Sequence, residues 1–299
     1  MVDVILCCYN QEATITQAVQ SIFSQKTSET INLIVADDAS SDATVVLINE
    51  VAHREMAKYH EIVDFWGGVQ VSYLQNSENL GMCRNYQRAF QACNSDFVFI
   101  LEGDDFWEPN HIEQHIQFLS RHPSCSMSMN RLTIIKEGNR EEVRGYENRQ
   151  EKKRSIPYKI LRKLYRCTLK KYLEVARKRK DSKEYKTWTL REQILGNRLG
   201  NLSGCCFRGK FIRALPNRLF EISFADWLLG MIMAEYGDIA VLKESTSTYR
   251  IHLSGQWSGF SDEQKQERML NSAKIYNAYF DNKYRKYFKK LARTLGGDI

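Results

Sequence analysis

Residues 97–105 read Phe-Val-Phe-Ile-Leu-Glu-Gly-Asp-Asp, and this stretch decides the fold. Its first five residues are all apolar, which predicts a buried β-strand over 97–101. Three carboxylates follow at once, at Glu102, Asp104 and Asp105. They repel one another, and such a cluster is rarely kept without a cation. We therefore expect a divalent ion at this strand end, where it would recruit a diphosphate. An acidic loop or helix cap is the alternative explanation.

Similar short apolar runs precede this stretch and alternate with amphipathic segments. Residues at helical spacing follow the first two runs, around Ile15 to Phe23 and Val45 to Ala52. This order is typical of βαβ units around a parallel sheet. The further strands that we predict are Val2 to Cys8, Ile31 to Ala36 and Val69 to Gln75.

Polar clusters come directly after two of these strands, as Tyr9-Asn10-Gln11-Glu12 and as Asp37-Asp38. In an open α/β sheet, ligands bind beyond the carboxyl ends of the strands. Ser41 or Asp42 is expected to cap the next helix, which leaves Asp37 and Asp38 to be explained. An acidic side chain at such a strand end can accept hydrogen bonds from a ribose hydroxyl or a base N–H. We therefore expect a nucleotide at this edge.

Length and composition favour one main domain, because 299 residues with 43% hydrophobic content can bury one large core. The chain runs from Met1 straight into a strand pattern, and its apolar runs are too short to span a bilayer. We therefore expect a cytoplasmic protein that does not cross a membrane. The eight cysteines include no Cys-x-x-Cys motif, which favours buried, reduced thiols over zinc or redox chemistry.

The net charge of +7 is unevenly spread. Residues 149–186 carry 16 Lys/Arg against 4 Asp/Glu, so the rest of the chain is acidic, with a net charge of −5. Apolar residues at helical spacing between Ile160 and Ala176 predict a basic amphipathic helix. The tail repeats this theme between Tyr279 and Arg293. Such helices are a solvated face, a nucleic-acid patch or a membrane-surface element, and the repetition favours an anionic membrane surface over nucleic acid.

Further along the chain, Cys205 to Arg208 is predicted as a return strand, Phe224 to Tyr236 as a helix and Ser261 to Leu295 as one or two helices. Six motifs, in order and with their spacing, resemble the family 2 glycosyltransferases of the GT-A fold over roughly residues 2–258. They are Tyr9-Asn10-x-Glu12, Asp37-Asp38-x-Ser-x-Asp42, Asn79-Leu80-Gly81-x-x-Arg84-Asn85, Glu102-x-Asp104-Asp105, Asp226-Trp227 and Tyr249-Arg250-x-His252.

This resemblance implies a GT-A domain over residues 1–258, with a mostly parallel central sheet, a Rossmann-like nucleotide-binding half and a basic helical insertion at 149–190. Residues 259–299 would form a basic, helical C-terminal region that associates with a membrane. Asp104 would hold the ribose or reach the metal through water, and Asp105 would ligate Mn²⁺ or Mg²⁺ directly. The other donor-site residues that the resemblance implies are Tyr9, Asn10, Glu12, Asp38 near the base, Asn79, Gly81 and Arg84.

By the same resemblance, Asp226 matches the catalytic base, although Ala225 replaces the acid that usually precedes it. A simple helix cap is the alternative role for Asp226. His252 matches a position that contacts metal or phosphate in relatives, and a structural histidine is the alternative. Asn201, Ser203 and Trp227 are candidates for contact with the acceptor, although Asn201 and Ser203 also fit a plain turn. Glu102 stands where many members carry Asp, which leaves its role open.

The activity implied is transfer of one sugar, with inversion, from a nucleotide-diphosphate sugar to an acceptor hydroxyl. UDP-hexose is the expected donor because it is the commonest in the family, and a lipid-linked glycan at the inner face of a membrane is the expected acceptor. Processive members carry Gln-x-x-Arg-Trp and membrane spans, whereas this chain has only Gln256-Trp257. The alternatives are a sugar-phosphate nucleotidyltransferase, whose glycine-rich phosphate loop is absent after the first strand, and a non-catalytic scaffold that binds nucleotide sugars at a membrane.

Overall fold

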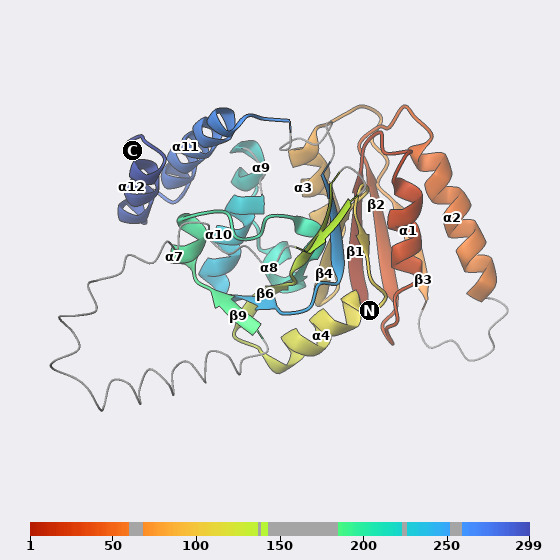
Figure 1. Ribbon diagram of the computed structural model, residues 1–299. Helices are drawn as coiled ribbons and strands as arrows, with labels where there is room; N and C mark the ends of the chain where they lie inside the picture. The colour runs from red at the N-terminus through yellow and green to blue at the C-terminus, as the bar shows by residue number, and fades with distance from the viewer. Residues whose placement is uncertain (60–67, 137–138, 143–184, 223–225, 252–258) are drawn as a thin grey trace.

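The computed structural model describes residues 1–59, 68–136, 139–142, 185–222, 226–251 and 259–299 (Figure 1). Its central sheet has eight strands in the order β3-β2-β1-β4-β10-β6-β11-β9. Their bounds are β1 Val2–Cys8, β2 Ile31–Asp37, β3 Val69–Tyr73, β4 Phe97–Glu102, β6 Cys125–Met129, β9 Tyr185–Trp188, β10 Cys205–Arg208 and β11 Asp238–Leu242. The first four strands of this order pair in parallel, as do β6 and β11, whereas β10 and β9 run antiparallel to their neighbours. The predicted α/β class with a mostly parallel sheet is confirmed.

Helices cover both faces of this sheet (Figure 1). Strand β1 is buried on both sides, because Val4 and Leu6 contribute to one hydrophobic cluster and Ile5 to the other. One cluster packs α1 (Ile15–Phe23), α2 (Thr44–Tyr59) and α4 (His111–Arg121). The other packs α3 (Met82–Ala92), α9 (Arg218–Ile222) and α10 (Asp226–Tyr236). The remaining short helices are α7 Leu190–Ile194, the 3-10 helix η1 Leu202–Gly204 and α8 Gly209–Arg213.

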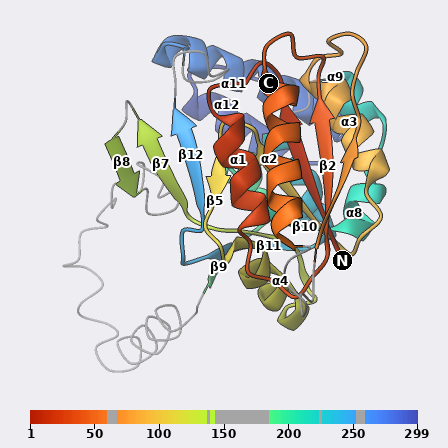
Figure 2. The ribbon, with the colours of Figure 1, turned by 90° about the vertical axis from the view of Figure 1, so that its right-hand side faces the viewer.

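A smaller sheet lies beside α1, in the strand order β5-β12-β7-β8 (Figure 2). Its strands are β5 Phe106–Trp107, β7 Leu132–Lys136, β8 Asn139–Glu142 and β12 Ser247–Ile251. Strand β5 begins directly after Asp105, and it pairs antiparallel with β12. This pairing places the Tyr249-Arg250 segment beside the end of the acidic cluster.

Sequence patterns predicted none of the strands between residues 125 and 190, and β6 shows why. Its sequence is Cys-Ser-Met-Ser-Met, and all five residues are buried. The buried serines have polar partners, since Ser128 Oγ lies 2.8 Å from His115 Nδ1 and Ser126 Oγ donates to the carbonyl of Gly237. Serine lowers the apparent hydrophobicity of a strand, so this central strand does not have the apolar run of β4.

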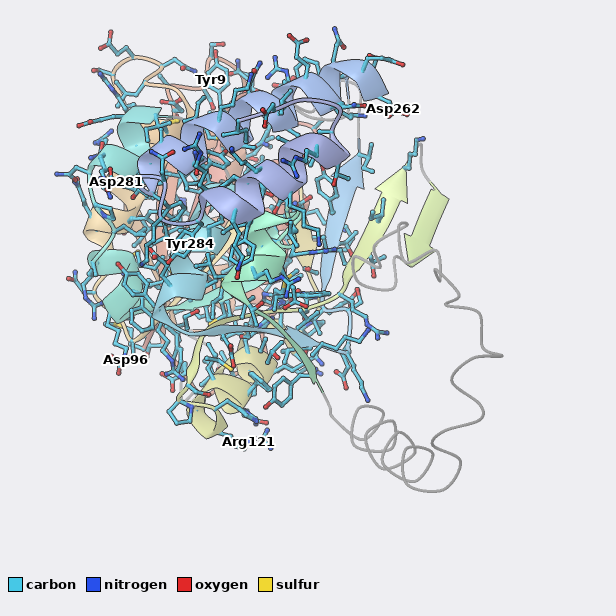
Figure 3. The ribbon with its side chains drawn as sticks, turned by 90° about the vertical axis from the view of Figure 1, so that its left-hand side faces the viewer. Tyr9, Asp96, Arg121, Asp262, Asp281 and Tyr284 are labelled. Atoms are coloured by element: carbon cyan, nitrogen blue, oxygen red, sulfur yellow. The ribbon has the colours of Figure 1, made fainter. Side chains whose placement is uncertain are left out.

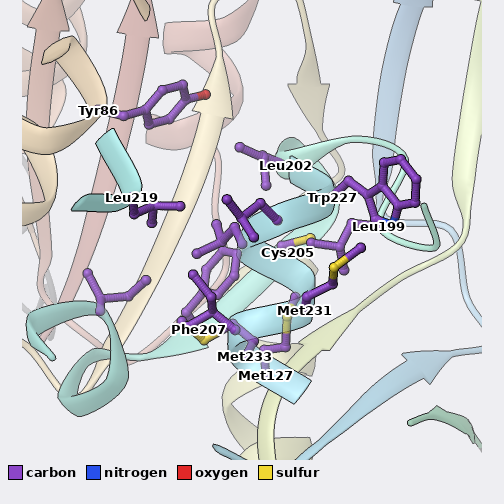
Figure 4. Packing of buried hydrophobic residues seen from close by; sticks show 14 of the residues in the cluster. Tyr86, Met127, Leu199, Leu202, Cys205, Phe207, Leu219, Trp227, Met231 and Met233 are labelled. Carbon is purple, nitrogen blue, oxygen red and sulfur yellow. The ribbon is translucent and has the colours of Figure 1, made fainter. Parts of the chain in front are cut away.

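The C-terminal helices α11 (Asp262–Tyr279) and α12 (Arg285–Thr294) share the core of the main domain. Tyr276, Phe288 and Leu291 belong to the same cluster as Phe207 and Met231, which Figure 4 shows around β10 and α10. This confirms the prediction of one or two helices after residue 261. The tail is therefore packed on the domain rather than attached to it as a separate body.

The predicted basic insertion at 149–190 lies mostly outside the described residues. Its last part differs from the prediction, because Tyr185–Trp188 forms strand β9 and pairs with β11 instead of continuing a helix. Tyr185 packs edge-on against Phe118 of α4, with ring centroids 4.7 Å apart. Within the described parts of the chain, no helix is both long enough and apolar enough to span a bilayer.

Seven of the eight cysteines lie in the described residues, where none of them forms a disulfide, whereas Cys167 lies outside these residues. Five are buried, and Cys7 and Cys83 are partly buried. Burial raises the pKa of the Cys205 and Cys206 thiols well above the usual value. These two therefore act as small core residues, as predicted.

Candidate active site

Three polar clusters meet at one edge of the sheet because the central strands end together. In the register of the sheet, Cys8 lies opposite Asp37, and Cys7 lies opposite Glu102. The loops that follow β1, β2 and β4 therefore start side by side. This is the edge at which ligands bind in open α/β sheets.

The acidic cluster predicted from the sequence is compact. Glu102, Asp104 and Asp105 each offer a carboxylate oxygen, and these oxygens lie within 4.8 Å of one another. Burial, and then repulsion by Asp105 and Asp104, raise the pKa of Glu102 well above its usual value. Burial, and then repulsion by Asp104, raise the pKa of Asp105 to about 7. Carboxylate oxygens are the ligands that Mg²⁺ and Mn²⁺ prefer, so the donor set fits a hard divalent cation.

Protein donors already hold Asp105, which is only 1% exposed. Its Oδ1 accepts a hydrogen bond of 3.0 Å from the backbone N–H of Arg250. Its Oδ2 accepts from Asn201 Nδ2 at 2.9 Å and from Ser203 Oγ at 2.6 Å. Asp104 is partly exposed, so its carboxylate is the more accessible of the two. Direct ligation by Asp105 stays a prediction.

Asp38 is held in a similar way, at the end of β2. Its Oδ1 accepts from Asn76 Nδ2 and from the N–H of Leu80, both at 2.8 Å, and its Oδ2 accepts from the N–H of Gly81 at 2.9 Å. Gly81 has φ +80°, a conformation that glycine adopts without strain. Asp38 therefore fastens the turn that starts α3, and its contact with a base stays a prediction.

The donor-site residues around this turn lie closer to solvent. Asn79 and Arg84 are exposed on it and on the first turn of α3. Asn79 Oδ1 accepts from the N–H of Gly81 at 3.0 Å. The structure thus brings Asp38, Asn79, Gly81 and Arg84 to one place.

The loop after β1 is tied to the start of α2. Asn10 has φ +50°, and its Oδ1 accepts from the N–H of Ser41 at 2.8 Å. Glu12 Oε2 accepts from the N–H of Ala43 at 3.0 Å, while the N–H of Glu12 donates to Asp42 Oδ2 at 3.0 Å. Asp42 Oδ1 accepts from the N–H of Thr44, the first residue of α2, at 2.9 Å, so Asp42 bonds to the start of the helix from one residue before the cap position.

Tyr9 precedes this loop and differs from it in exposure. Its side chain is 47% exposed, although most large hydrophobic residues of the domain are buried. An exposed aromatic ring at the ligand edge of the sheet is available to stack on a base. Its place in the nucleotide pocket stays a prediction.

Asp226 begins α10 and reaches the same edge. Its Oδ2 accepts from Asn197 Nδ2 at 2.7 Å, and its Oδ1 accepts from the N–H of Trp227 at 2.8 Å. Burial raises the pKa of Asp226, and the charge of Asp226 in turn contributes to the raised pKa of Glu102. The carboxylate thus lies near the acidic cluster, with a higher proton affinity than a solvated aspartate. A sequence pattern could not identify Asn197, because no motif marks it.

The other predicted residues lie as follows. Trp227 is buried, with its ring edge-on against Tyr276 of α11 and its Nε1 donating to the carbonyl of Gln193 at 2.6 Å. The Trp227 ring therefore faces the core, and contact with an acceptor stays a prediction.

Asn201 and Ser203 touch the acidic cluster. His252 lies outside the described residues, although Arg250 lies beside the cluster, with its guanidinium 5.1 Å from the centre of the Phe106 ring.

This sheet, with its acidic cluster at the carboxyl ends of the strands, is that of a GT-A domain. The sequence profile of glycosyl transferase family 2 matches residues 3–201, and the chain belongs to that family. The uncharacterized protein Rv1520 of Mycobacterium tuberculosis is 24% identical over 265 residues, which cover 88% of this chain and 62% of the relative. The chain therefore spans less than two thirds of the length of that relative.

Relatives with assigned names match shorter stretches. The putative glycosyltransferase EpsE of Bacillus subtilis is 28% identical over 121 residues, covering 40% of this chain and 39% of the relative. The Escherichia coli UDP-Glc:alpha-D-GlcNAc-diphosphoundecaprenol beta-1,3-glucosyltransferase WfaP is 27% identical over 119 residues, covering 40% and 41%.

Solved structures show the same fold. S. aureus TarS 1–349, in complex with UDP-GlcNAc, superposes with a TM-score of 0.63 at 15% identity, covering 98% of this chain and 71% of that structure. The mannosyltransferase PcManGT of Pyrobaculum calidifontis, in complex with GDP-Man and Mn²⁺, has a TM-score of 0.51 at 13% identity, covering 97% and 67%.

Proposed function

We propose that this protein transfers a single sugar from a nucleotide-diphosphate sugar, UDP-hexose, to an acceptor hydroxyl with inversion at the anomeric carbon. The observation that carries this proposal is the nearness of Asp226 to the Glu102–Asp105 cluster. A carboxylate with raised proton affinity then stands beside a site built for a cation and a diphosphate. In-line displacement needs a base on the acceptor side and charge stabilisation on the donor side.

Different residues would act as the base on the acceptor side and stabilise charge on the donor side. Asp226 accepts the proton of the acceptor hydroxyl as it attacks, and Asn197 holds the carboxylate in one orientation through its Oδ2. Glu102, Asp104 and Asp105 would hold Mn²⁺ or Mg²⁺, which supplies Lewis-acid stabilisation of the departing diphosphate when bound. The exposed ring of Tyr9 and the exposed Arg84 would contact the nucleotide.

The acceptor is proposed to be a lipid-linked glycan. The name of WfaP, a relative over 40% of this chain, describes an acceptor on diphosphoundecaprenol. Helix α12 adds a second reason, because it contains five cations and no acidic residue in Arg285–Thr294. Phe288 and Leu291 pack into the core, so the cations lie on the outer face, where Figure 3 shows α12 beside Tyr284. Such a face is attracted to anionic lipid headgroups.

Metal-dependent binding of UDP, measured by calorimetric titration with Mn²⁺ and with EDTA, tests the donor side. We expect Asp104→Asn and Asp105→Asn each to lower the affinity for UDP about tenfold or more in Mn²⁺, because the charge of the diphosphate is then less well neutralised. With EDTA, the wild type and both variants should bind alike. Unchanged affinity in Asp105→Asn alone would make its direct ligation wrong. No dependence on metal in the wild type would overturn the proposed donor site.

A further inference from the structure

The side chain of Asn201 is held by hydrogen bonds to the acidic cluster and to its own turn. Its two Nδ2 hydrogens go to Asp105 Oδ2 at 2.9 Å and to Glu102 Oε2 at 3.2 Å. Its Oδ1 accepts from the N–H of Ser203 at 2.7 Å. The side chain is 4% exposed. Both of its N–H donors are thus directed at the acidic motif, and contact with an acceptor stays a prediction.

Ser203 contacts the same two acidic residues. Its Oγ donates to Asp105 Oδ2 at 2.6 Å, and the N–H of Glu102 donates to the same Oγ at 3.0 Å. Asn201 and Ser203 thus hold both ends of the acidic motif. In the sequence they come long after this motif, just before β10. Both are neutral. A Lys or Arg in this place would hold the carboxylates equally well but would repel a cation.

The turn itself is firmly anchored. Trp107, which is buried, donates from Nε1 to the carbonyl of Ser203 at 2.6 Å. A Cβ atom on Gly204 would lie 2.7 Å from Asn130 Oδ1, so the backbone here passes close to its neighbour. The donors at Asn201 and Ser203 are therefore held in place before any ligand arrives.

We propose that Asn201 and Ser203 are positioning residues, which set the orientation and separation of the Glu102 and Asp105 carboxylates for a divalent cation. This inference rests on the metal site of the proposed function. Without the neutral donors, two repelling carboxylates turn apart, and the cation must reorganise them as it binds. Groups that orient metal ligands typically change metal affinity by about 10- to 100-fold.

The test is a titration of the protein with Mn²⁺ in the absence of any nucleotide. The electron paramagnetic resonance signal of free Mn²⁺ measures how much of the ion is bound. We expect Asn201→Leu, which keeps the branched shape of the side chain with larger, apolar end groups, to weaken Mn²⁺ binding about tenfold. Ser203→Ala removes one hydroxyl and should weaken binding in the same direction with little effect on folding. The matched control is Asn277→Leu on α11, since Asn277 is also 4% exposed but donates to a neutral amide, Asn282 Oδ1, at 2.6 Å.

A double-mutant cycle separates positioning from a general structural effect. In an Asp105→Asn background, Asn201→Leu should cause less than about a twofold further loss, because its main partner is already changed. Additive losses, or Mn²⁺ affinity in Asn201→Leu and Ser203→Ala equal to that of Asn277→Leu, would overturn the inference. A wild type that binds no Mn²⁺ would instead overturn the metal site of the proposed function.

Discussion

Asp226 differs from the other carboxylates at the sheet edge in how it is held. Asp38 and Asp105 each accept three hydrogen bonds from elsewhere in the protein and are almost fully buried. Asp226 is only partly buried, and among the described residues two groups donate to it, one of them the N–H of the next residue. It therefore keeps lone pairs with which to take a proton. A partly exposed carboxylate with a raised pKa is suited to take up a proton.

The variant Asp226→Asn tests this role. Asparagine keeps the shape and remains an equally good helix cap, but it cannot take up the acceptor proton. We expect the rate of sugar transfer to fall by about 10² to 10⁴, while UDP affinity changes little. Transfer rate and UDP affinity should be measured on the same preparation. Because asparagine has one carboxamide oxygen for two donors, a loss of about 1 kcal/mol in stability is also expected.

Asp262→Asn is the matched control, because Asp262 begins α11 as Asp226 begins α10. It should leave transfer unchanged. Near-normal turnover in Asp226→Asn would mean that Asp226 is not the catalytic base and only caps the helix. A joint loss of turnover and UDP affinity would place it on the donor side instead.

At the scale of elements, α4 buries two imidazoles. His111 and His115 are fully buried, their ring centroids lie 4.6 Å apart, and Trp107 stacks on His111 at 4.5 Å. Each Nδ1 lies 2.8 Å from a hydroxyl, of Thr246 and of Ser128 respectively. Burial lowers the pKa of His115 to about 3, and burial and then His115 lower the pKa of His111 well below its usual value. The folded protein therefore holds both rings neutral.

This burial predicts acid sensitivity. Unfolding exposes imidazoles that take up protons near pH 6.5, so the free energy of unfolding falls as the pH decreases from about 6.5 towards the lowered pKa values. His115→Gln removes one of these groups and should reduce the loss of stability between pH 6.5 and 4.5 by about 2 kcal/mol. Urea unfolding at several pH values measures the free energy of unfolding of the wild type and of the variant. The control is His53→Gln, at an exposed position on α2, which should show the wild-type dependence of the unfolding free energy on pH. The prediction fails if His115→Gln also shows the wild-type dependence.

The elements near the site differ in how far sequence could predict them. Strands β1, β2 and β4 followed from their apolar runs, with ends within one residue of those observed. Strand β3 ends at Tyr73, two residues before the predicted end at Gln75. The small sheet could not be predicted, because β12 pairs with β5 and β7 only through long-range contacts. For the same reason, the motif residues were found, but two of their partners were not: Asn197, which donates to Asp226, and Tyr86, whose hydroxyl donates to Glu102 Oε1 at 3.3 Å.

At the scale of the whole molecule, the C-terminal helices combine an apolar face that packs into the core with an exposed basic face. Tyr276 of α11 packs against Trp227, beside the candidate base, while α12 packs through Phe288 and Leu291 and presents its cations outward. In the described residues, Lys286, Lys290 and Arg293 take part in no salt bridge, whereas Lys283 pairs with Glu235 at 2.9 Å. If this face meets an anionic membrane, the active site is held at a fixed orientation to the lipid surface.

Reversing the charge of α12 tests that arrangement. The triple variant Lys286→Glu, Lys290→Glu and Arg293→Glu should lower partition onto phosphatidylserine vesicles at low salt by about a hundredfold or more, since each basic residue near the surface contributes about 1 kcal/mol. Cosedimentation measures it, and higher salt should weaken binding of the wild type. The control variant reverses Arg121, Lys210 and Lys243, which are exposed on other elements and give the same change in net charge.

We expect the control to stay bound, because local charge at the contact acts within about 10 Å at 0.1 M salt. Equal release of both variants would mean that only net charge matters, and vesicle binding unchanged in the α12 variant would exclude this face. Both variants should transfer sugar to a soluble acceptor as the wild type does, because the substituted side chains are exposed, whereas Asn197 and Trp227 hold Asp226. Loss of that activity in the α12 variant would instead indicate that its packing against α7 and α11 had been disturbed.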